Sequence, residues 1–227
     1  MSASKLLASA KDLRLFRQIE RKLYVPVISD SLDSLDCRDH AMHPRVRPLR
    51  ESFQFAGRAR TVQWQYMFGK DPSPYEIEIK FMDSLGPGDV VIYNSDPRLT
   101  NAPWGELMST AAIHRGAKGA IIDSCVRDVK KIFKLNFPVF ATAIAPLDSA
   151  GRGKVVAYDV PIESGGVHIE PRDLVVADYD GVVVIPQSIE KEVLKRSFQK
   201  VSKENKTRNE LRKGKLLGEV YAKYGVL

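Results

Sequence analysis

Side chains suited to acid–base chemistry and anion binding lie at the two ends of one short segment of this chain. Glu106 follows Pro103 and Gly105 at a predicted helix start, and Arg127 and Asp128 come directly after a short apolar run. A carboxylate, a guanidinium and the free amides of a helix N-terminus can together hold a divalent metal ion and a small anionic substrate. The sequence therefore predicts a metal-assisted site, provided that the two ends of the segment meet.

The segment between Glu106 and Arg127 has the length of one helix and one returning strand. A helix of about 12 residues rises roughly 18 Å. After a turn at Gly116–Gly119, a strand over residues 120–125 returns roughly 20 Å. Because the outward and returning lengths nearly match, we expect the helix start and the strand end to meet at one edge of a sheet.

Each of these side chains also has an ordinary structural interpretation. Asp128 can cap the short helix or turn predicted over residues 129–135, and Arg127 can form a surface ion pair. Glu106 can interact with the dipole of the helix that it begins. Gly105 either lets a ligand approach the backbone closely or packs the helix end against the sheet. The residue types alone leave both interpretations open.

Composition limits the class of protein to which the chain can belong. Its 227 residues, 44% of them hydrophobic, are enough for one sizeable core, and we predict a single domain over residues 1–227. No apolar run reaches the length of a membrane span, and residues 1–16 lack the apolar stretch of a secretory signal. Cys37 and Cys125 are isolated, which is typical of a reducing compartment and favours a cytoplasmic protein.

The positive charge of the chain is concentrated near its C-terminus. Residues 190–215 contain ten Lys or Arg and four Glu, so they carry +6 of the net charge of +7. Basic and acidic residues alternate along this stretch, as on a solvated helix face. No aromatic cluster accompanies the basic residues, which argues against a nucleic-acid-binding surface.

The remaining pattern predicts a mixed α/β domain with helices at both ends and strands in the middle. Residues 24–29 are expected to be extended, with Ser29, Asp30 and Ser31 as N-cap candidates for the helix that follows. Helices are predicted over residues 5–23, 31–36, 75–85 and 189–213, with a last helical turn over 217–224. Strands are predicted over residues 57–65, 90–94, 137–141, 154–160, 167–169, 174–178 and 181–185.

Several stretches of the chain resemble the RraA-like family, which includes the 4-hydroxy-4-methyl-2-oxoglutarate aldolases. The resemblance covers residues 25–215, with two departures. Arg172 stands where family members usually carry Gly, and the insert Cys37–Ser52 is longer than expected. The motifs are Val27–Asp30, Gly105-Glu106-Leu107, Gly116, Gly119, Ile122-Asp123, Val126-Arg127-Asp128, Phe137–Phe140, Gly165–Pro171, Asp173-Leu174 and Asp178–Pro186.

The resemblance implies a fold and an assembly. The family fold is a compact α/β domain of the swivelling β/β/α type with a mixed sheet. In this chain it would be flanked by an N-terminal helix over residues 1–24 and a helical extension over 189–227. The resemblance also implies a homotrimer, sometimes paired into a homohexamer, with the sites between subunits.

The resemblance further assigns roles to the residues of the predicted site. It implies that Asp128 contacts Mg²⁺ or Mn²⁺, and that Arg127 and the amides of Gly105–Leu107 bind the carboxylate of a small 2-oxo acid. Glu106 would orient or deprotonate a water on the ion. Asp30 and Glu204 would come from a neighbouring subunit.

The catalytic interpretation predicts a carbon–carbon lyase that releases pyruvate, with oxaloacetate decarboxylation as a companion activity. Asp96, in the loop before the site helix, is a candidate for one more oxygen ligand. Two alternatives remain. Some relatives are regulators that bind an RNA-degrading enzyme and lack the catalytic Asp, and Asp128 is present here. A lysine Schiff base is the second, although no lysine stands in the motif. The four His residues show no metal-ligand spacing.

Overall fold

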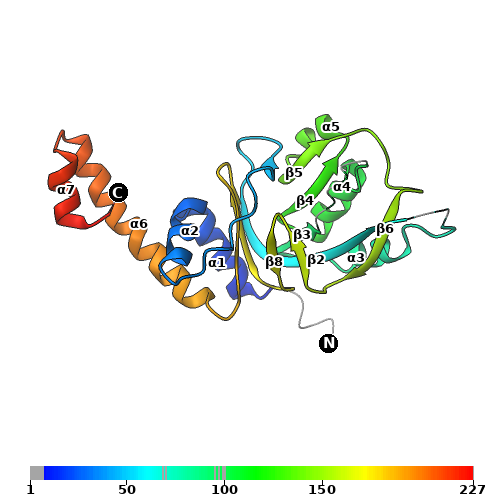
Figure 1. Ribbon diagram of the computed structural model, residues 1–227, viewed down its shortest axis with the longest axis horizontal. Helices are drawn as coiled ribbons and strands as arrows, with labels where there is room; N and C mark the ends of the chain where they lie inside the picture. The colour runs from blue at the N-terminus through cyan, green and yellow to red at the C-terminus, as the bar shows by residue number, and fades with distance from the viewer. Residues whose placement is uncertain are drawn as a thin grey trace.

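The computed structural model describes residues 8–67, 69, 71–94, 96, 98 and 101–226 of the chain. Within these residues a strongly curved mixed sheet is covered by helices on its outer sides (Figure 1). The helices are α1 (Ala10–Lys22), α2 (Val25–Asp33), α3 (Glu76–Asp83), α4 (Glu106–Arg115), α5 (Val129–Leu135), α6 (Glu190–Arg212) and α7 (Leu217–Tyr224). The strands are β1 (Arg47–Pro48), β2 (Phe55–Tyr66), β3 (Asp89–Tyr93), β4 (Gly119–Val126), β5 (Val139–Ile144), β6 (Gly153–Tyr158), β7 (Ile162–Ser164), β8 (Val167–Ile169), β9 (Leu174–Asp178) and β10 (Gly181–Ile185).

The sheet combines a parallel centre with antiparallel edges. Its order is β1-β5-β4-β3-β2-β9-β10, and β6 pairs with the second half of β2. Strands β2, β3, β4 and β5 run parallel, whereas β1, β6, β9 and β10 pair antiparallel with their neighbours. The carboxyl ends of β3, β4 and β5 therefore share one edge, where the loops before α4 and after β4 meet.

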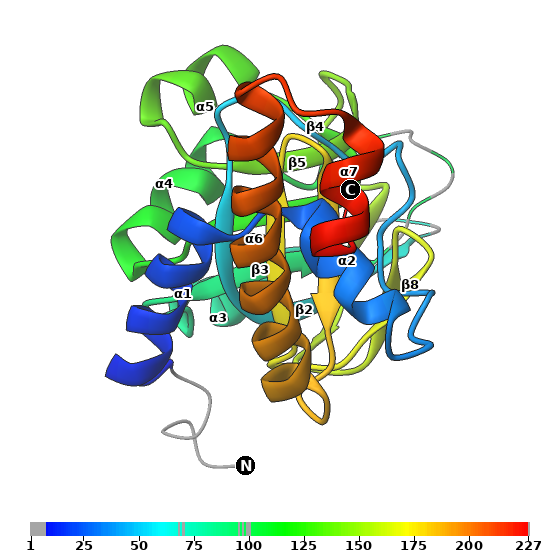
Figure 2. The same ribbon diagram turned by 90° about the vertical axis from the view of Figure 1, so that its left-hand side faces the viewer.

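Three buried clusters hold the layers together. One lies between the sheet and helices α3, α4 and α5, and a second fills the inside of the curved sheet. The third lies between β9, β10 and helices α1, α2 and α6, which lie on the same side of the sheet (Figure 2). The first cluster supports the predicted site, because it contains Trp104, a buried side chain of the loop before α4.

The C-terminal half of α6 and the whole of α7 extend away from the sheet (Figure 1). Within α6 the buried residues are few, and most side chains after Ser202 are exposed or half-buried. None of the helices in the described part of the chain combines the length and apolarity that a membrane crossing requires.

The predicted fold class is confirmed, and so are most elements. The short strands β1 and β7 were not predicted, and the entry to the domain differs from its prediction. The sequence predicts an extended segment over residues 24–29, but Val25–Asp33 forms one helix, with Tyr24 as its N-cap. Pro26 fits the first helical turn, and Val25, Ile28 and Leu32 are buried at helical spacing. Asp30 therefore lies inside a helix, and the predicted N-cap role of Ser29–Ser31 is wrong.

Arg172, the departure from the family turn, occupies a left-handed backbone conformation with φ of 77°. Glycine adopts this conformation without a steric penalty, and arginine does not. The Arg172 guanidinium donates a 2.8 Å hydrogen bond to Asp89, a fully buried carboxylate that also pairs with Arg60. The ion pair offsets the backbone strain. Arginine at position 172 thus adds a second cation, beside Arg60, to the buried Asp89 carboxylate.

The insert around residues 37–52 is also tied to the core. Arg45 donates two hydrogen bonds, of 3.1 and 2.9 Å, to the buried carboxylate of Asp123 in β4. Arg47 and Pro48 form the short strand β1, which pairs with β5. The insert therefore extends the sheet by one edge strand, which the sequence did not predict.

Candidate functional site

The start of α4 and the end of β4 meet, as the segment lengths predicted. Trp104 pairs with Val126 in an isolated parallel bridge, and the Arg127 amide donates a 3.0 Å hydrogen bond to the Trp104 carbonyl. The Glu106 amide points at Asp128 Oδ2 across 3.4 Å. The predicted meeting of Glu106, Arg127 and Asp128 at one sheet edge is therefore confirmed.

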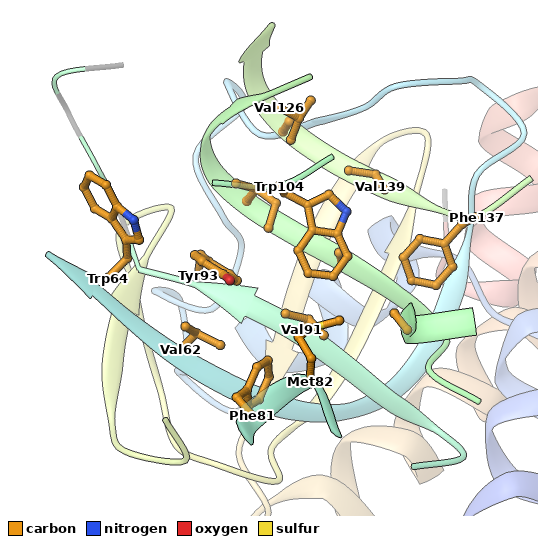
Figure 3. Packing of buried hydrophobic residues seen from close by; sticks show 14 of the residues in the cluster. Val62, Trp64, Phe81, Met82, Val91, Tyr93, Trp104, Val126, Phe137 and Val139 are labelled. Atoms are coloured by element: carbon orange, nitrogen blue, oxygen red, sulfur yellow. The ribbon is translucent and has the colours of Figure 1, made fainter. Parts of the chain in front are cut away.

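The buried side chain of Trp104 holds the loop before α4 in place. Its side chain is fully buried, and its ring lies 6.4 Å from Phe137 in a stacked arrangement and 6.2 Å from Tyr93 edge-to-face (Figure 3). The indole Nε1 donates a 2.9 Å hydrogen bond to Ser109 Oγ, which donates in turn to the Gly105 carbonyl. A large aromatic anchor thus holds the backbone that begins the helix.

Gly105 is the N-cap of α4 and has no side chain to cap the first amides of the helix; the Glu106 amide instead donates a long, 3.4 Å hydrogen bond to Asp128. A Cβ atom at this position would lie 2.8 Å from Asp128 Oδ2 and 3.2 Å from Arg127 Cγ. Any other residue would displace one of these side chains. The packing interpretation of Gly105 is therefore confirmed, and its role in admitting a ligand to the backbone stays a prediction.

Asp128 adopts a left-handed conformation with φ of 57° and precedes α5. Its side chain makes no capping hydrogen bond to α5. Asp128 therefore occupies the N-cap position of α5, but its carboxylate does not cap that helix. Its carboxylate is turned toward Gly105 and the start of α4, and 39% of the side-chain surface is exposed.

A cavity of about 440 Å³ lies over this junction, between α3, α4 and the loops after β4 and β5. Gly105, Glu106, Leu107, Arg127 and Asp128 all line it. The other lining residues are Tyr75, Glu78, Ile79, Met82, Asp83, Ala102, Pro103, Trp104, Met108, Ala111, Asp148 and Ser149.

Arg127 lies between two carboxylates and is the one cationic side chain among the described residues that line the cavity. Its Nη2 is 3.4 Å from Asp148 Oδ1, and its Nε is 3.9 Å from Asp128 Oδ2. Tyr75 donates a 3.1 Å hydrogen bond to the other oxygen of Asp148. Asp148 therefore steadies the guanidinium, and the long contacts leave its donors open to an incoming carboxylate.

Five polar lining residues were not predicted as site residues from the sequence: Tyr75, Glu78, Asp83, Asp148 and Ser149. Asp148 follows β5, and the carboxyl end of β5 meets the same edge as that of β4, so strand order would have indicated it. Burial, together with the hydrogen bond to Asp148, raises the pKa of Tyr75. Burial also raises the pKa of Glu78 against the opposing hydrogen bond from Tyr93, and the charge of Asp148 adds to the rise.

Glu106 retains both of its predicted interpretations. As the first residue of α4 it lies at the positive end of the helix dipole. Its Oε1 accepts a 3.1 Å hydrogen bond from Thr110, and its Oε2 is 3.9 Å from the exposed Lys131 ammonium. The carboxylate is 23% exposed and lines the cavity, so it can reach a bound molecule.

The donor set around Asp128 fits a hard divalent ion that keeps several waters. The described residues contain no group of three or more His, Cys, Asp or Glu side chains arranged to hold a metal. Mg²⁺ often takes one or two protein carboxylates and completes its shell with water and substrate. Asp128 makes only long contacts, at 3.4 and 3.9 Å, so its oxygens are open to an ion. Glu106 and Asp148 add carboxylates to the same cavity.

The structure does not bring Asp30 and Glu204 to this cavity within one chain. Asp30 forms a 2.6 Å ion pair with Lys200. Glu204 accepts a hydrogen bond from Tyr24 and lies 3.9 Å from Arg208. Burial raises the pKa of Glu204, and the Arg208 charge opposes the rise. Both carboxylates belong to the α1, α2 and α6 side of the fold, and their predicted roles require a neighbouring subunit.

Asp96 does not line the cavity either. Its amide donates a 3.0 Å hydrogen bond to the Asp123 carbonyl, and its Oδ1 accepts from the Arg98 amide at 3.1 Å. Burial, assisted by the Asp96 charge, raises the pKa of the nearby Cys125 thiol. Asp96 therefore lies beside β4. Within one chain it does not join Asp128 in the cavity as a further oxygen ligand.

Comparison with known proteins gives consistent matches. The RraA-like family, described as Aldolase/RraA, matches residues 25–184. A protein of Halalkalibacterium halodurans named "Putative 4-hydroxy-4-methyl-2-oxoglutarate aldolase" is 36% identical over 182 residues, covering 79% of this chain and 80% of that protein. The crystal structure of an uncharacterized protein from Pseudomonas syringae pv. tomato superposes with a TM-score of 0.84 at 27% identity, covering 96% and 97% of the two chains. RraAS2 of Streptomyces coelicolor, described as an unusual member of the RNase ES inhibitor RraA protein family, superposes with a TM-score of 0.78 at 26% identity, covering 87% and 98%.

Proposed function

This chain belongs to the RraA-like family, and we propose that it is a divalent-metal-dependent lyase that releases pyruvate from a 4-hydroxy-2-oxo acid. One observation carries the proposal. The Arg127 guanidinium, the first residues of α4 and the Asp128 carboxylate, which makes only long contacts, line one cavity. The aldolase name of a relative with 36% identity supports the same reaction class.

The chain's own groups are arranged to bind the 2-oxo acid by its carboxylate. Arg127 presents a planar fork of donors, which suits bidentate contact with a carboxylate. The amides of Gly105–Leu107 add hydrogen-bond donors and the positive end of the helix dipole. These groups fix the C1 end of the substrate, and the bond between C3 and C4 then lies further into the cavity.

Asp128 would hold Mg²⁺ or Mn²⁺, which, when bound, supplies Lewis acidity at the carbonyl end of the substrate. Arg127 stabilises the negative charge that moves toward the C2 oxygen as the C3–C4 bond breaks. Glu106, oriented by Thr110, is placed to receive the proton of the C4 hydroxyl, directly or through a water. The same charge develops when oxaloacetate loses CO₂, so decarboxylation is a companion activity.

We also propose that the active assembly is a homotrimer, or a homohexamer built from two trimers. Asp30 and Glu204 do not line the cavity of their own chain and belong to the side that carries α6. The C-terminal half of α6 extends beyond the sheet (Figure 1). An extension of this kind can deliver Glu204 to the cavity of a neighbour, where it would act with Glu106.

A regulator that binds a ribonuclease is the second candidate, and the likeness to RraAS2, a member of an RNase ES inhibitor family, favours it. Asp128 distinguishes the candidates, because the enzyme needs a metal-binding carboxylate at this position and a binding surface does not. A regulator would show no turnover on any 2-oxo acid and would bind a ribonuclease with or without Asp128.

The proposed function is tested by measuring pyruvate release from a panel of 4-hydroxy-2-oxo acids and oxaloacetate, with and without Mg²⁺ or Mn²⁺. We expect release that requires the added ion and stops with EDTA. Activity that survives chelation and is trapped by borohydride would indicate a lysine Schiff base instead. Absence of release from every member of the panel, in the presence of either ion, would contradict the enzyme.

A further inference from the structure

A buried hydroxyl group contacts the start of α4. Ser109 lies one helical turn after Gly105 and is fully buried. Its Oγ accepts a 2.9 Å hydrogen bond from Trp104 Nε1 and donates a 2.9 Å hydrogen bond to the Gly105 carbonyl. A serine hydroxyl has a single proton. Because the indole N–H already donates to Oγ, that proton is left for the Gly105 carbonyl.

Ser109 contacts the Gly105 carbonyl a second time. The Ser109 amide donates to the same oxygen at 3.1 Å, so the amide and the hydroxyl together use both of its lone pairs. Gly105 itself is fully extended, with φ of −157° and ψ of −160°, and without a side chain its backbone has more freedom than that of any other residue. The two contacts with Ser109 therefore fix a peptide group that glycine alone leaves free to rotate.

The other side of this peptide group faces Asp128. A trans peptide is planar, and its C=O and N–H point in opposite directions. The N–H that belongs to the Gly105 carbonyl is the Glu106 amide, which donates the 3.4 Å hydrogen bond to Asp128 Oδ2. The orientation that Ser109 gives to the carbonyl thus decides where the Glu106 N–H points. A single long hydrogen bond orients a carboxylate without using all of its acceptor positions.

We propose that Ser109 is a positioning residue for the ion-binding carboxylate. Through the peptide between Gly105 and Glu106, its hydroxyl directs the Glu106 N–H at Asp128 and keeps the Asp128 carboxylate turned toward the start of α4. This inference rests on the proposed function, in which Asp128 holds the ion. Trp104 and Ser109 are fully buried within their own chain, so the arrival of a neighbouring subunit leaves this link unchanged.

The first experiment removes the hydroxyl. Ser109→Ala deletes one oxygen atom and introduces the residue that favours a helix most, so the variant is expected to fold. We expect its Mn²⁺ affinity, measured by calorimetric titration of the full chain, to fall about tenfold, as is typical when a group that supports a metal ligand is removed. Wild-type affinity in folded Ser109→Ala would overturn the proposal. Absence of Mn²⁺ binding to the wild-type protein would instead overturn the proposed function, and the role of Ser109 with it.

Ser197→Ala is the matched control. Ser197 is also a fully buried serine within a helix, and its Oγ lies 2.9 Å from the Val193 carbonyl and 3.0 Å from Ser31 Oγ. It lines none of the described cavities. Its loss should lower the thermal unfolding midpoint without changing Mn²⁺ affinity. An equal loss of affinity in Ser197→Ala would show that general destabilisation explains the result, and would overturn the proposal.

A second variant separates the hydroxyl from the aromatic anchor. Trp104→Phe removes the indole donor and leaves a void in the core, but Ser109 can still donate to the Gly105 carbonyl. We expect Trp104→Phe to lower the unfolding midpoint more than Ser109→Ala does, with Mn²⁺ affinity close to that of the wild type. A loss of affinity in Trp104→Phe as large as in Ser109→Ala would mean that packing of the loop, and not the hydroxyl, positions Asp128, and would overturn the proposal.

Discussion

Gly105 and Asp128 approach each other so closely that a Cβ atom on Gly105 would lie 2.8 Å from Asp128 Oδ2. A contact this short forces one of the two groups to move. We predict that Gly105→Ala displaces the Asp128 carboxylate and lowers both Mn²⁺ affinity and kcat about tenfold or more, in line with the effect of disturbing a ligand's surroundings. Calorimetric titration with Mn²⁺ measures the affinity, and pyruvate release measures kcat.

Gly218→Ala is the matched control for this variant. Gly218 lies in the first turn of α7, and a Cβ atom there would meet nothing within 4 Å. This change should leave ion binding and turnover unaltered, because alanine favours the helix. Wild-type Mn²⁺ affinity in Gly105→Ala would show that the Asp128 carboxylate does not hold the ion.

Asp128 can be tested directly with an isosteric variant. Its left-handed backbone conformation is tolerated by asparagine better than by alanine, so Asp128→Asn removes the charge with little added strain. We predict a loss of more than about 100-fold in kcat, because the Lewis acid contributes several kcal/mol, and no change in thermal unfolding without metal. EDTA should have the same effect on the wild-type protein. Substantial turnover of Asp128→Asn at saturating Mg²⁺ would place the ion elsewhere.

The site could be predicted from the sequence because it depends on lengths that follow from regular geometry. One helix and one strand of known rise return the chain to its starting point, so Glu106 and Arg127 had to meet. Segment lengths do not predict the cavity residues Glu78 and Asp148, although the order of the strands would have indicated the edge at which Asp148 lies. Glu78 enters from α3, and Asp148 from an irregular loop after β5, and both depend on how separate elements pack.

The first residues of α2 show a second reason why sequence-based prediction fails. The run from Tyr24 to Ser29 contains valine, isoleucine and proline, which are typical of an extended segment, but tertiary burial of Val25, Ile28 and Leu32 favours the helix. Local propensity is a weak effect, and the α1–α2–α6 cluster overrides it. The Arg172 conformation could not be inferred from the sequence either, since its compensation comes from Asp89, more than 80 residues away in the chain.

Arg127 is predicted to act on both binding and turnover. Arg127→Ala removes a charge-assisted contact with the substrate carboxylate, worth about 1.5–3 kcal/mol, so kcat/KM should fall roughly 10- to 150-fold. KM should rise because ground-state binding is lost, and kcat should fall because the guanidinium also neutralises charge in the transition state. Steady-state kinetics with oxaloacetate separates the two. A rise in KM with unchanged kcat would limit Arg127 to substrate binding.

The stability of the protein in acid should depend on Asp12. Burial alone would raise the pKa of Asp12, but hydrogen bonds from Ser9 and Arg58 together lower it from 3.8 to about 2. A depressed pKa in the folded state means that the stabilisation is complete above about pH 4 and is lost as the pH falls toward 2. Asp12→Asn should therefore destabilise the protein by about 1–2 kcal/mol at pH 7, after allowance for partial exposure. Denaturant unfolding of both proteins measures the difference in their free energy of unfolding between pH 7 and pH 2. This difference should shrink as the pH falls from about 4 to 2, and a constant difference would show that the ionised Asp12 carboxylate does not stabilise the fold.

The last prediction concerns the assembly. Glu204 lies on α6 beyond Ser202, where the helix is highly charged and contributes little to the core of its own chain. If α6 delivers Glu204 to a neighbouring cavity, truncation before Ser202 should abolish turnover, and light scattering of the full chain should give a trimer or hexamer. Asp128→Ala and Glu204→Ala chains, each inactive alone, should regain partial activity when mixed after dissociation, because some hybrid interfaces then combine an intact Asp128 with an intact Glu204. Native mass spectrometry verifies that hybrids have formed. An active monomer, or verified hybrids without recovered activity, would mean that each site is built within a single chain.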